Sequence, residues 1–142
     1  DLLRTSGGKY VAPQPIESQL RAIPLVSQAV VVCDGQRFVT ALLSLDPERA
    51  QKFAEQNQLP TDMVALVGHD KIRSLLTEHI DRLNQTLARF EQIKRYTIIP
   101  REFSLERDEV TPTQKLRRKV IVKNYAPEIA AMYVEPEGDS SG

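Results

Sequence analysis

The stretch Gln28-Ala-Val-Val-Val-Cys-Asp-Gly-Gln-Arg-Phe-Val-Thr-Ala-Leu-Leu-Ser-Leu45 decides the fold class of this 142-residue chain. Its outer parts, residues 28–33 and 38–45, are rich in β-branched residues, and Asp34-Gly-Gln-Arg37 between them is a tight-turn sequence. The stretch therefore predicts an antiparallel hairpin. Residues 93–99 alternate and end before Pro100, so we expect a third strand that joins this hairpin.

Four other segments have helical patterns. They are residues 13–23, 46–58, 70–90 and 115–132. Asp46 suits the N-cap and Pro47 the first turn of the second segment, while the third has the strongest apolar repeat, at spacings of three and four. Pro127 must kink or split the last segment. Together they predict an α+β fold, in which a small, mainly antiparallel sheet of about three strands, plus an N-terminal two-stranded hairpin, packs with helices.

Length and composition predict one domain with one modest core. The chain has 142 residues, of which 41% are hydrophobic. Lys and Arg number 19, as do Asp and Glu, so the net charge is zero and a generic binder of nucleic acid or of anionic membranes is not expected. We expect the fold to occupy residues 1–134 and the polar stretch 135–142 to be a disordered tail.

No apolar stretch in the sequence approaches the roughly 20 residues that a transmembrane helix needs, and the N-terminus lacks a signal pattern. We therefore expect a cytoplasmic protein, or one peripheral to a membrane. Cys33 follows an apolar run and is expected to be a buried structural thiol. His69 and His79 lack the spacing and the cysteine partners of a metal site, so no metal ligands are predicted.

Two loops in the sequence are framed by glycine or proline and hold a lysine. The first, Ser6-Gly-Gly-Lys9, has two adjacent residues without a Cβ, which permits a positive φ or the close approach of a ligand. By itself it indicates only a turn between short strands. It lacks the glycine spacing of a Walker phosphate loop.

The second loop, Thr111-Pro-Thr-Gln114, has the spacing of a capping box, in which Gln follows Thr by three residues. One interpretation is a capped helix that carries Lys115 and the basic run Arg117-Arg-Lys119 on a solvated face. The other is that Lys115 is a mobile cation for a carboxylate or phosphate. Its point charge would then stabilise charge that develops only in a transition state.

Several sequence segments, taken in order, resemble those of a known family. They are Ser6-Gly-Gly-Lys-Tyr-Val-Ala-Pro13, Pro15-Ile-Glu17, Val30-Val-Val32 with its hairpin, and Thr111-Pro-Thr-Gln-Lys-Leu-Arg-Arg118. Together they are similar to the C-terminal domain of AMP-forming (adenylate-forming) acyl-CoA synthetases, and closest to the long-chain fatty-acid CoA ligases. The resemblance covers residues 1–134. Two motifs in this order are far more specific than either motif alone.

The resemblance implies the mobile domain of a two-step ligase of fatty-acid metabolism. A carboxylate attacks the α-phosphate of ATP to give acyl-adenylate and pyrophosphate, and the CoA thiol then displaces AMP. Lys115 matches the family's catalytic lysine of the first step. Ser6, Gly7 and Gly8 match the loop that lines the CoA tunnel in the second step, with Gly7 as the position of closest approach. Lys9 is a further candidate for binding the nucleotide phosphate or CoA.

The same resemblance implies an N-terminal adenylation domain as the partner, which binds ATP with its Mg²⁺ and the fatty acid. The isolated domain is then expected to be inactive, with the family hinge immediately before Asp1. Many relatives have Gly where this chain has Gln114. Alternatives stay open: a non-catalytic binding module of the same fold, or transfer of the acyl group to a carrier protein instead of CoA. The run 117–119 could meet CoA phosphates or form a solvated helix face.

Overall fold

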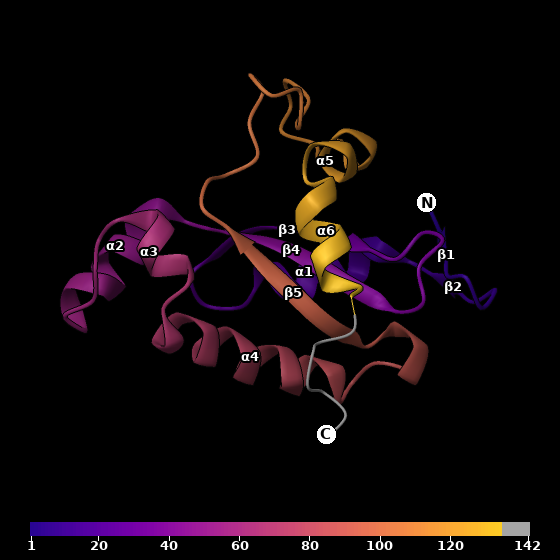
Figure 1. Ribbon diagram of the computed structural model, residues 1–142, viewed down its shortest axis with the longest axis horizontal. Helices are drawn as coiled ribbons and strands as arrows, with labels where there is room; N and C mark the ends of the chain where they lie inside the picture. Colours follow the sequence, from indigo (N-terminus) through magenta and orange to yellow (C-terminus); the bar gives the residue numbers. More distant parts are fainter. Residues whose placement is uncertain (135–142) are drawn as a thin grey trace.

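The computed structural model describes residues 1–134 (Figure 1), so the predicted tail at 135–142 lies outside the described residues. The described part is an α+β fold, as predicted, with a two-stranded and a three-stranded sheet. The strands are β1 (Leu3–Arg4), β2 (Tyr10–Val11), β3 (Val26–Val32), β4 (Val39–Leu45) and β5 (Ile93–Ile99). The helices are α1 (Pro13–Arg21), α2 (Pro47–Gln56), α3 (Met63–Val67), α4 (Asp70–Asn84), α5 (Arg118–Asn124) and α6 (Ala126–Met132), with a 3₁₀ turn, η1, at Arg89–Glu91.

The three-stranded sheet has the order β3-β4-β5, so β4 is central. The predicted hairpin is confirmed, because β3 and β4 are antiparallel, with Val31 opposite Ala41. The predicted third strand is also confirmed. However, β5 runs parallel to β4, which makes the sheet mixed. A parallel neighbour needs a crossover instead of a tight turn, and α2, α3 and α4 form that crossover.

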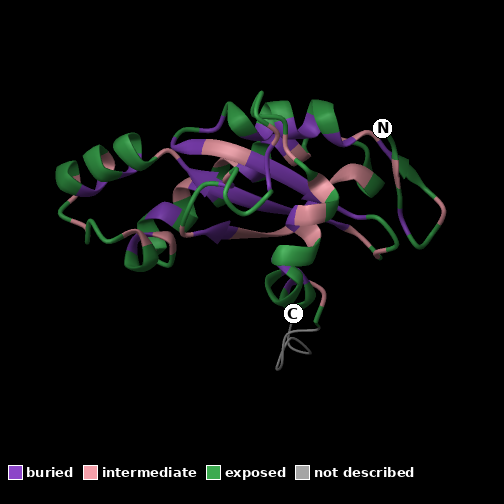
Figure 2. Cartoon of the chain, turned by 90° about the horizontal axis from the view of Figure 1, so that it is seen from above, coloured by how far each residue is buried: buried purple, intermediate pink, exposed green. Residues whose placement is uncertain are grey.

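Both faces of this sheet are buried, as the colouring of Figure 2 shows. Successive residues of a strand point to opposite faces. In β3, Ala29 and Val31 accordingly belong to one apolar cluster, and Val30 and Val32 belong to another. The first cluster includes residues of α1 to α4, and the second includes residues of α5 and α6. The sheet thus divides the apolar core, which composition predicted as one, into two clusters.

The structure agrees with the predicted start of α2 and corrects the predicted end of α4. Asp46 caps α2 as expected, with its Oδ1 accepting from the Glu48 N–H at 3.0 Å. The helix predicted over 70–90 ends at Asn84, so the prediction is wrong beyond that residue. The Asn84 side chain accepts from the N–H of Ile93 at 2.8 Å and donates to its carbonyl at 2.9 Å, which directs the chain into β5. No helix had been predicted at α3.

The last predicted helix, 115–132, is split, as Pro127 requires. Its two parts, α5 and α6, meet at Tyr125, and Pro127 lies in the first turn of α6. The predicted start is wrong, because the first helical residue is Arg118. Lys115 therefore lies outside any helix.

Residues 110–116 form a tight hairpin, which we call the Lys115 hairpin, and not the capping box that was one of the two interpretations of this segment. Val110 pairs with Leu116 across it. The Thr111 N–H donates to the Lys115 carbonyl at 2.8 Å, and the Lys115 N–H donates to the Thr111 Oγ1 at 3.0 Å. The Gln114 N–H donates to the Thr111 carbonyl at 2.8 Å, and Gln114 has a φ of 69°. This left-handed conformation at Gln114 is incompatible with a helix that starts at Thr111.

The hairpin of β1 and β2, residues 3–11, closes with the same turn, and we call it the Lys9 hairpin. The Thr5 N–H donates to the Lys9 carbonyl at 2.9 Å, and the Gly8 N–H donates to the Thr5 carbonyl at 3.0 Å. The Lys9 N–H donates to the Thr5 Oγ1 at 3.1 Å, and Gly8 has a φ of 85°. Both turns are three-residue loops whose last residue is left-handed. Each lysine therefore leaves its loop at the equivalent position.

Tyr133, which follows α6, fastens that helix to the β3–β4 hairpin. Its hydroxyl oxygen lies 2.8 Å from the Phe38 carbonyl oxygen and 3.0 Å from the Val32 carbonyl oxygen. The Thr40 hydroxyl lies 3.0 Å away. Burial is the main reason that the pKa of Tyr133 is raised to about 12.

Replacing Tyr133 by Phe should destabilise the protein and flatten its response to alkaline pH. Losing the hydroxyl leaves buried carbonyls with fewer donors, at a cost of about 1 kcal/mol in the free energy of unfolding. The raised pKa means that Tyr133 stabilises the fold fully below pH 10, the ordinary tyrosine value, and loses this contribution as pH rises toward about 12. Urea unfolding at pH 8 and pH 11 tests this. The prediction fails if the free energy of unfolding falls by the same amount from pH 8 to pH 11 in the unsubstituted protein and in Tyr133→Phe.

The two turns predict opposite responses to substitution at equivalent positions. A left-handed conformation costs an ordinary L-residue roughly 1–2 kcal/mol, whereas glycine adopts it freely. Gln114→Gly should therefore stabilise the protein by up to about 1 kcal/mol, and Gly8→Ala should destabilise it by about as much. Urea denaturation of both variants measures the two changes. Destabilisation by Gln114→Gly would refute the equivalence of the turns.

Candidate functional site

Lys115 is exposed, and the chain on both sides of its hairpin is held in place. The N–H of Arg117 donates to the Glu109 carbonyl at 2.8 Å, and the Arg117 guanidinium forms an ion pair with Asp108. Thr111 fixes the backbone of Lys115 itself. The ammonium group thus sits at the end of a flexible side chain on a fixed backbone.

Glu109 is fully buried and connects the base of this hairpin to α5. Its Oε1 accepts from the Ser104 N–H at 3.1 Å, and its Oε2 accepts from the Asn124 Nδ2 at 3.0 Å. Burial first, and then the charge of Glu109, raises the pKa of the neighbouring Tyr125. The carboxylate therefore joins the segment before Lys115 to the helix that follows it.

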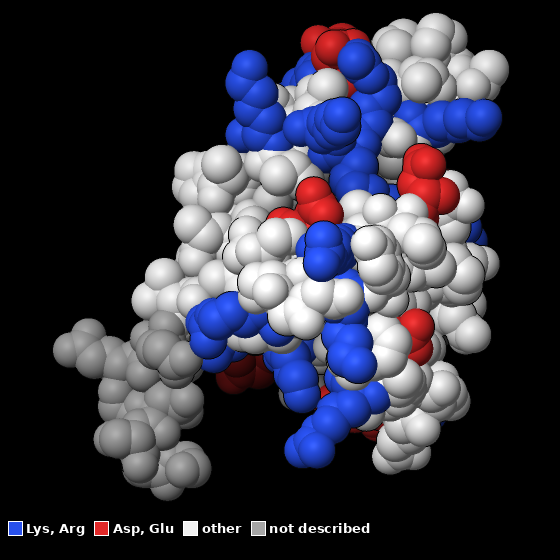
Figure 3. Space-filling view, turned by 90° about the vertical axis from the view of Figure 1, so that its right-hand side faces the viewer, with Lys and Arg blue, Asp and Glu red and all other residues white. Residues whose placement is uncertain are grey.

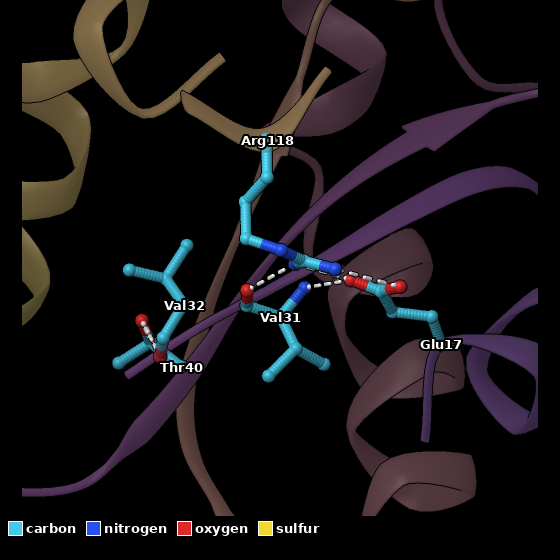
Figure 4. Close-up of polar contacts among 5 residues, drawn as sticks. All are labelled: Glu17, Val31, Val32, Thr40 and Arg118. Carbon is cyan, nitrogen blue, oxygen red and sulfur yellow. Dashed lines mark hydrogen bonds and ion pairs between the residues drawn. The ribbon is translucent and has the colours of Figure 1, made fainter. Parts of the chain in front are cut away.

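Arg118, three residues after Lys115, forms a largely buried ion pair with Glu17 of α1 (Figure 4). The Arg118 Nη1 lies 2.6 Å from the Glu17 Oε2, and its Nη2 lies 3.2 Å from the Oε1. Both side chains also bind the backbone of Val31 in β3. The Arg118 Nη1 donates to the Val31 carbonyl at 2.7 Å, and the Val31 N–H donates to the Glu17 Oε2 at 2.8 Å. Only 6% of the Glu17 side chain and 26% of the Arg118 side chain are exposed.

These contacts correct both readings of the basic run 117–119 at Arg118 alone. Arg117 is paired with Asp108, and Arg118 is occupied by Glu17 and Val31, so Arg118 belongs neither to a solvated face nor to a free anion site. Lys119 is exposed.

The Lys9 hairpin is bound to the turn between β3 and β4. The Arg4 N–H donates to the Asp34 Oδ1 at 3.1 Å, and the Arg4 carbonyl accepts from the Gly35 N–H at 2.8 Å. Ser6, Gly7 and Lys9 are exposed at the loop. The Lys9 Nζ lies 5.6 Å from the centre of the Phe90 ring, which is 39% exposed.

The two adjacent glycines of this loop have different requirements. Gly8 is left-handed, so the fold itself favours glycine there. A Cβ built on Gly7 would meet only the Thr5 Oγ1, at 3.9 Å, and the φ of Gly7 is not positive. Nothing in the described part of the domain therefore requires glycine at position 7.

The depression next to the Lys115 hairpin is not lined by either predicted lysine loop. This open depression of about 870 Å³ lies between the start of the chain and the segment that follows Lys115. It is lined by Asp1, Leu2, Leu3, Gln14, Asp34, residues 116–120 and Val122. Neither Lys115 nor residues 6–9 are among these described lining residues.

Basic side chains predominate at the end of the molecule that carries β1 and β2 (Figure 3). The net charge of the chain is zero, so acidic groups must predominate elsewhere. Part of that balance lies on α4, where a shallow hollow is lined by Asp70, Glu78 and Asp81 together with Arg73 and two hydroxyl side chains. The charge distribution favours anionic ligands at the end with β1 and β2.

Within residues 1–134, no group of three or more His, Cys, Asp or Glu side chains is arranged to hold a metal ion. Every helix in the same range is too short or too polar to cross a bilayer.

The Glu17–Arg118 pair is the part of the site that sequence reasoning missed. Both residues lay inside the motifs that carry the family resemblance, but no spacing rule links side chains 101 positions apart. The available signal was an acidic residue on the apolar side of α1, next to Ile16 and one turn before Leu20. A buried carboxylate at such a position predicts a partner without identifying it.

Comparison with known proteins agrees with the resemblance. The family model described as the AMP-binding enzyme C-terminal domain matches residues 1–137. The long-chain-fatty-acid–CoA ligase FadD15 of Mycobacterium tuberculosis is 38% identical over 137 residues, which is 94% of this chain and 22% of that protein. The long-chain-fatty-acid–CoA ligase ACSBG2 of Mus musculus is 30% identical over 153 residues, which is 94% of this chain and 23% of that protein. This chain thus spans about a fifth of the length of these relatives.

Solved structures share the fold. The adenylation domain of a carboxylate reductase from Mycobacterium chelonae matches with a TM-score of 0.72 at 20% identity, over 94% of this chain and 19% of that one. The A-PCP didomain of a carboxylic acid reductase from Segniliparus rugosus, in complex with AMP, matches with a TM-score of 0.69 at 23% identity. The match covers 93% of this chain and 17% of that one. Because the matched family range contains both lysine hairpins and the whole described fold, this chain belongs to the AMP-binding enzyme C-terminal domains, the family of the acyl-CoA ligases it resembles.

Proposed function

We propose that this chain is the C-terminal lid domain of a long-chain fatty-acid CoA ligase and that it contributes a different hairpin to each of two chemical steps. The observation that carries the proposal is the presentation of Lys115, an exposed ammonium on a backbone held by Thr111 and flanked by anchored residues. The relatives named as long-chain-fatty-acid–CoA ligases supply the substrate class. The substrates are then ATP, a fatty acid and CoA.

In the first step, a carboxylate oxygen of the fatty acid attacks the α-phosphorus of ATP, and the bond to the pyrophosphate oxygen breaks. Negative charge shifts toward the leaving pyrophosphate as that bond lengthens. The Lys115 ammonium reaches the reacting carboxylate and phosphate oxygens and stabilises this charge. Because Thr111 already fixes the Lys115 backbone, only side-chain torsions need to be ordered when the lysine engages.

In the second step, the sulfur of CoA attacks the acyl carbon, and the bond between that carbon and the AMP oxygen breaks. Ser6, Gly7 and Gly8 line the channel for the pantetheine arm, with Gly7 at the closest approach. Lys9 supplies a cation for a phosphate of CoA or of the nucleotide. Its contact with Phe90 is worth only about 0.5–1 kcal/mol at an exposed site, so a phosphate can displace it.

The proposal makes a larger N-terminal domain the partner that binds ATP, its Mg²⁺ and the fatty acid. The 142-residue chain alone is therefore not expected to turn over, and the parent enzyme is placed in the cytoplasm or at a membrane surface. Transfer to a carrier protein is a related possibility for the second step. Competition between free CoA and a phosphopantetheinylated carrier identifies the acceptor.

Lys115→Ala in the parent full-length enzyme should slow adenylation by about 10²–10³-fold, because one preorganised donor to the transition state is lost. Thioester formation from pre-made acyl-adenylate should survive. Pyrophosphate release and thioester formation are measured separately, with Lys119→Ala, an exposed neighbouring lysine, as the control. If Lys115→Ala retains both activities, the catalytic assignment fails and a non-catalytic binding module becomes the better description.

Substitutions at Gly7 should affect thioester formation more than adenylation. The series Gly7→Ala and Gly7→Leu should lower the second rate progressively as the side chain enters the channel. The domain tolerates a Cβ at this position, so the free energy of unfolding should change by no more than about 0.5 kcal/mol. Equal effects on both half-reactions, or a loss of stability that parallels the loss of rate, would argue against a channel-lining role.

A further inference from the structure

We propose that Glu17 is a positioning residue for both chemical steps, because its ion pair with Arg118 fixes the Lys9 hairpin and the Lys115 hairpin relative to each other; this inference rests on the proposed function. Glu17 touches neither lysine. It acts through the chain segments that connect the pair to the two hairpins.

Each member of the pair is joined to one hairpin by a short, ordered segment. Glu17 is the fifth residue of α1, and only Ala12 separates α1 from β2 of the Lys9 hairpin. Arg118 is the first residue of α5 and follows the last residue of the Lys115 hairpin by two positions. The ion pair therefore bridges the two loops by a short route.

The buried apolar residues of these two helices belong to different clusters. Ile16 and Leu20 of α1 belong to the cluster on one face of the three-stranded sheet, whereas Ile121 of α5 belongs to the cluster on the other face. In Figure 1, α1 lies behind the sheet and α6, which follows α5, lies in front of it. The Glu17–Arg118 pair joins the two layers around the outer edge of β3.

The backbone of β3 sets the position of the pair. Val31 lies on an edge strand, and its N–H and carbonyl bind Glu17 and Arg118 (Figure 4). The guanidinium and the carboxylate meet in a two-point contact, which fixes their mutual angle as well as their distance. A single salt contact between flexible surface side chains would fix neither.

At Arg118, the pair borders the open depression and is not fully covered by packed side chains. Next to Arg118, residues 1–3 and 116–120 are separated by the open depression of about 870 Å³ instead of by packed side chains. Stability alone is a poor explanation for a buried ion pair, because apolar residues of similar volume often stabilise a protein as well or better. Orientation of two charged loops is a role that apolar replacements would not reproduce with the same angular precision.

The test compares Glu17→Gln and Arg118→Lys with Glu78→Gln in the parent full-length enzyme. Glu78 forms an exposed ion pair with Arg82 on α4 and provides a matched control away from both hairpins. Both half-reactions are measured at saturating substrate and normalised to the folded fraction. We expect Glu17→Gln to slow both steps by about 10–100-fold, because misplacement of about 1 Å can cost 10²-fold. The rates of Arg118→Lys should lie between those of Glu17→Gln and Glu78→Gln, since lysine keeps the charge of arginine without its planar guanidinium.

The geometry is measured independently with spin labels attached through Lys9→Cys and Lys115→Cys. Other accessible cysteines are replaced, but Cys33 can remain because its side chain is fully buried. Its pKa is raised to about 11, mainly by burial, so the thiol reacts poorly with the label. The distance distribution between the labels should broaden with Glu17→Gln and stay unchanged with Glu78→Gln. If Glu17→Gln fails to fold, Arg118→Lys provides the same comparison.

Three results would overturn the inference: an unchanged distance distribution, unchanged rates despite a broader distribution, or the same effects in Glu78→Gln. Failure of the proposed function has a different signature. In that case Lys115→Ala leaves adenylation intact, while the label distances still report whether Glu17 and Arg118 hold the hairpins in place.

Discussion

Burial of the three-stranded sheet on both faces is the constraint on which the rest of the structure depends. Helices must cover both sides, so the chain places α1 to α4 on one face and returns with α5 and α6 to cover the other. The outer edge of β3 then becomes a place where side chains from both layers can meet. Glu17 and Arg118 occupy it, and the backbone of Val31 receives both.

Features of the fold that depend on local chemistry could be predicted from the sequence. The β3–β4 hairpin follows from two β-branched runs around Asp34 and Gly35, and α2 follows from its Asp46 cap. The end of α4 depends on a contact between Asn84 and Ile93 that helical periodicity does not contain. The parallel direction of β5 was also invisible, because it is decided by where the crossover helices return the chain.

The arrangement of the candidate site was predictable only where its parts are contiguous in the sequence. The motif order singles out the Ser6–Lys9 loop and Lys115 as candidates, whereas the local pattern at Thr111 has the spacing of a helix cap and gives no sign of a hairpin. Pairing of Val110 with Leu116 and the left-handed Gln114 decide that competition, and no local propensity reveals them. The Glu17–Arg118 pair is more distant still, since its members meet only after the sheet has brought the beginning and the end of the domain together.

The order in which the two faces are covered affects synthesis of the chain. The β3–β4 hairpin is local, whereas β5 must wait for closure of the long segment between residues 45 and 93. Val30, Val32 and Leu42 then remain on an open face until Phe103, Val110 and the last two described helices arrive. A nascent chain whose residues 118–132 have not yet left the ribosome therefore exposes an apolar sheet surface. An exposed apolar surface of this kind is prone to aggregation and to capture by chaperones.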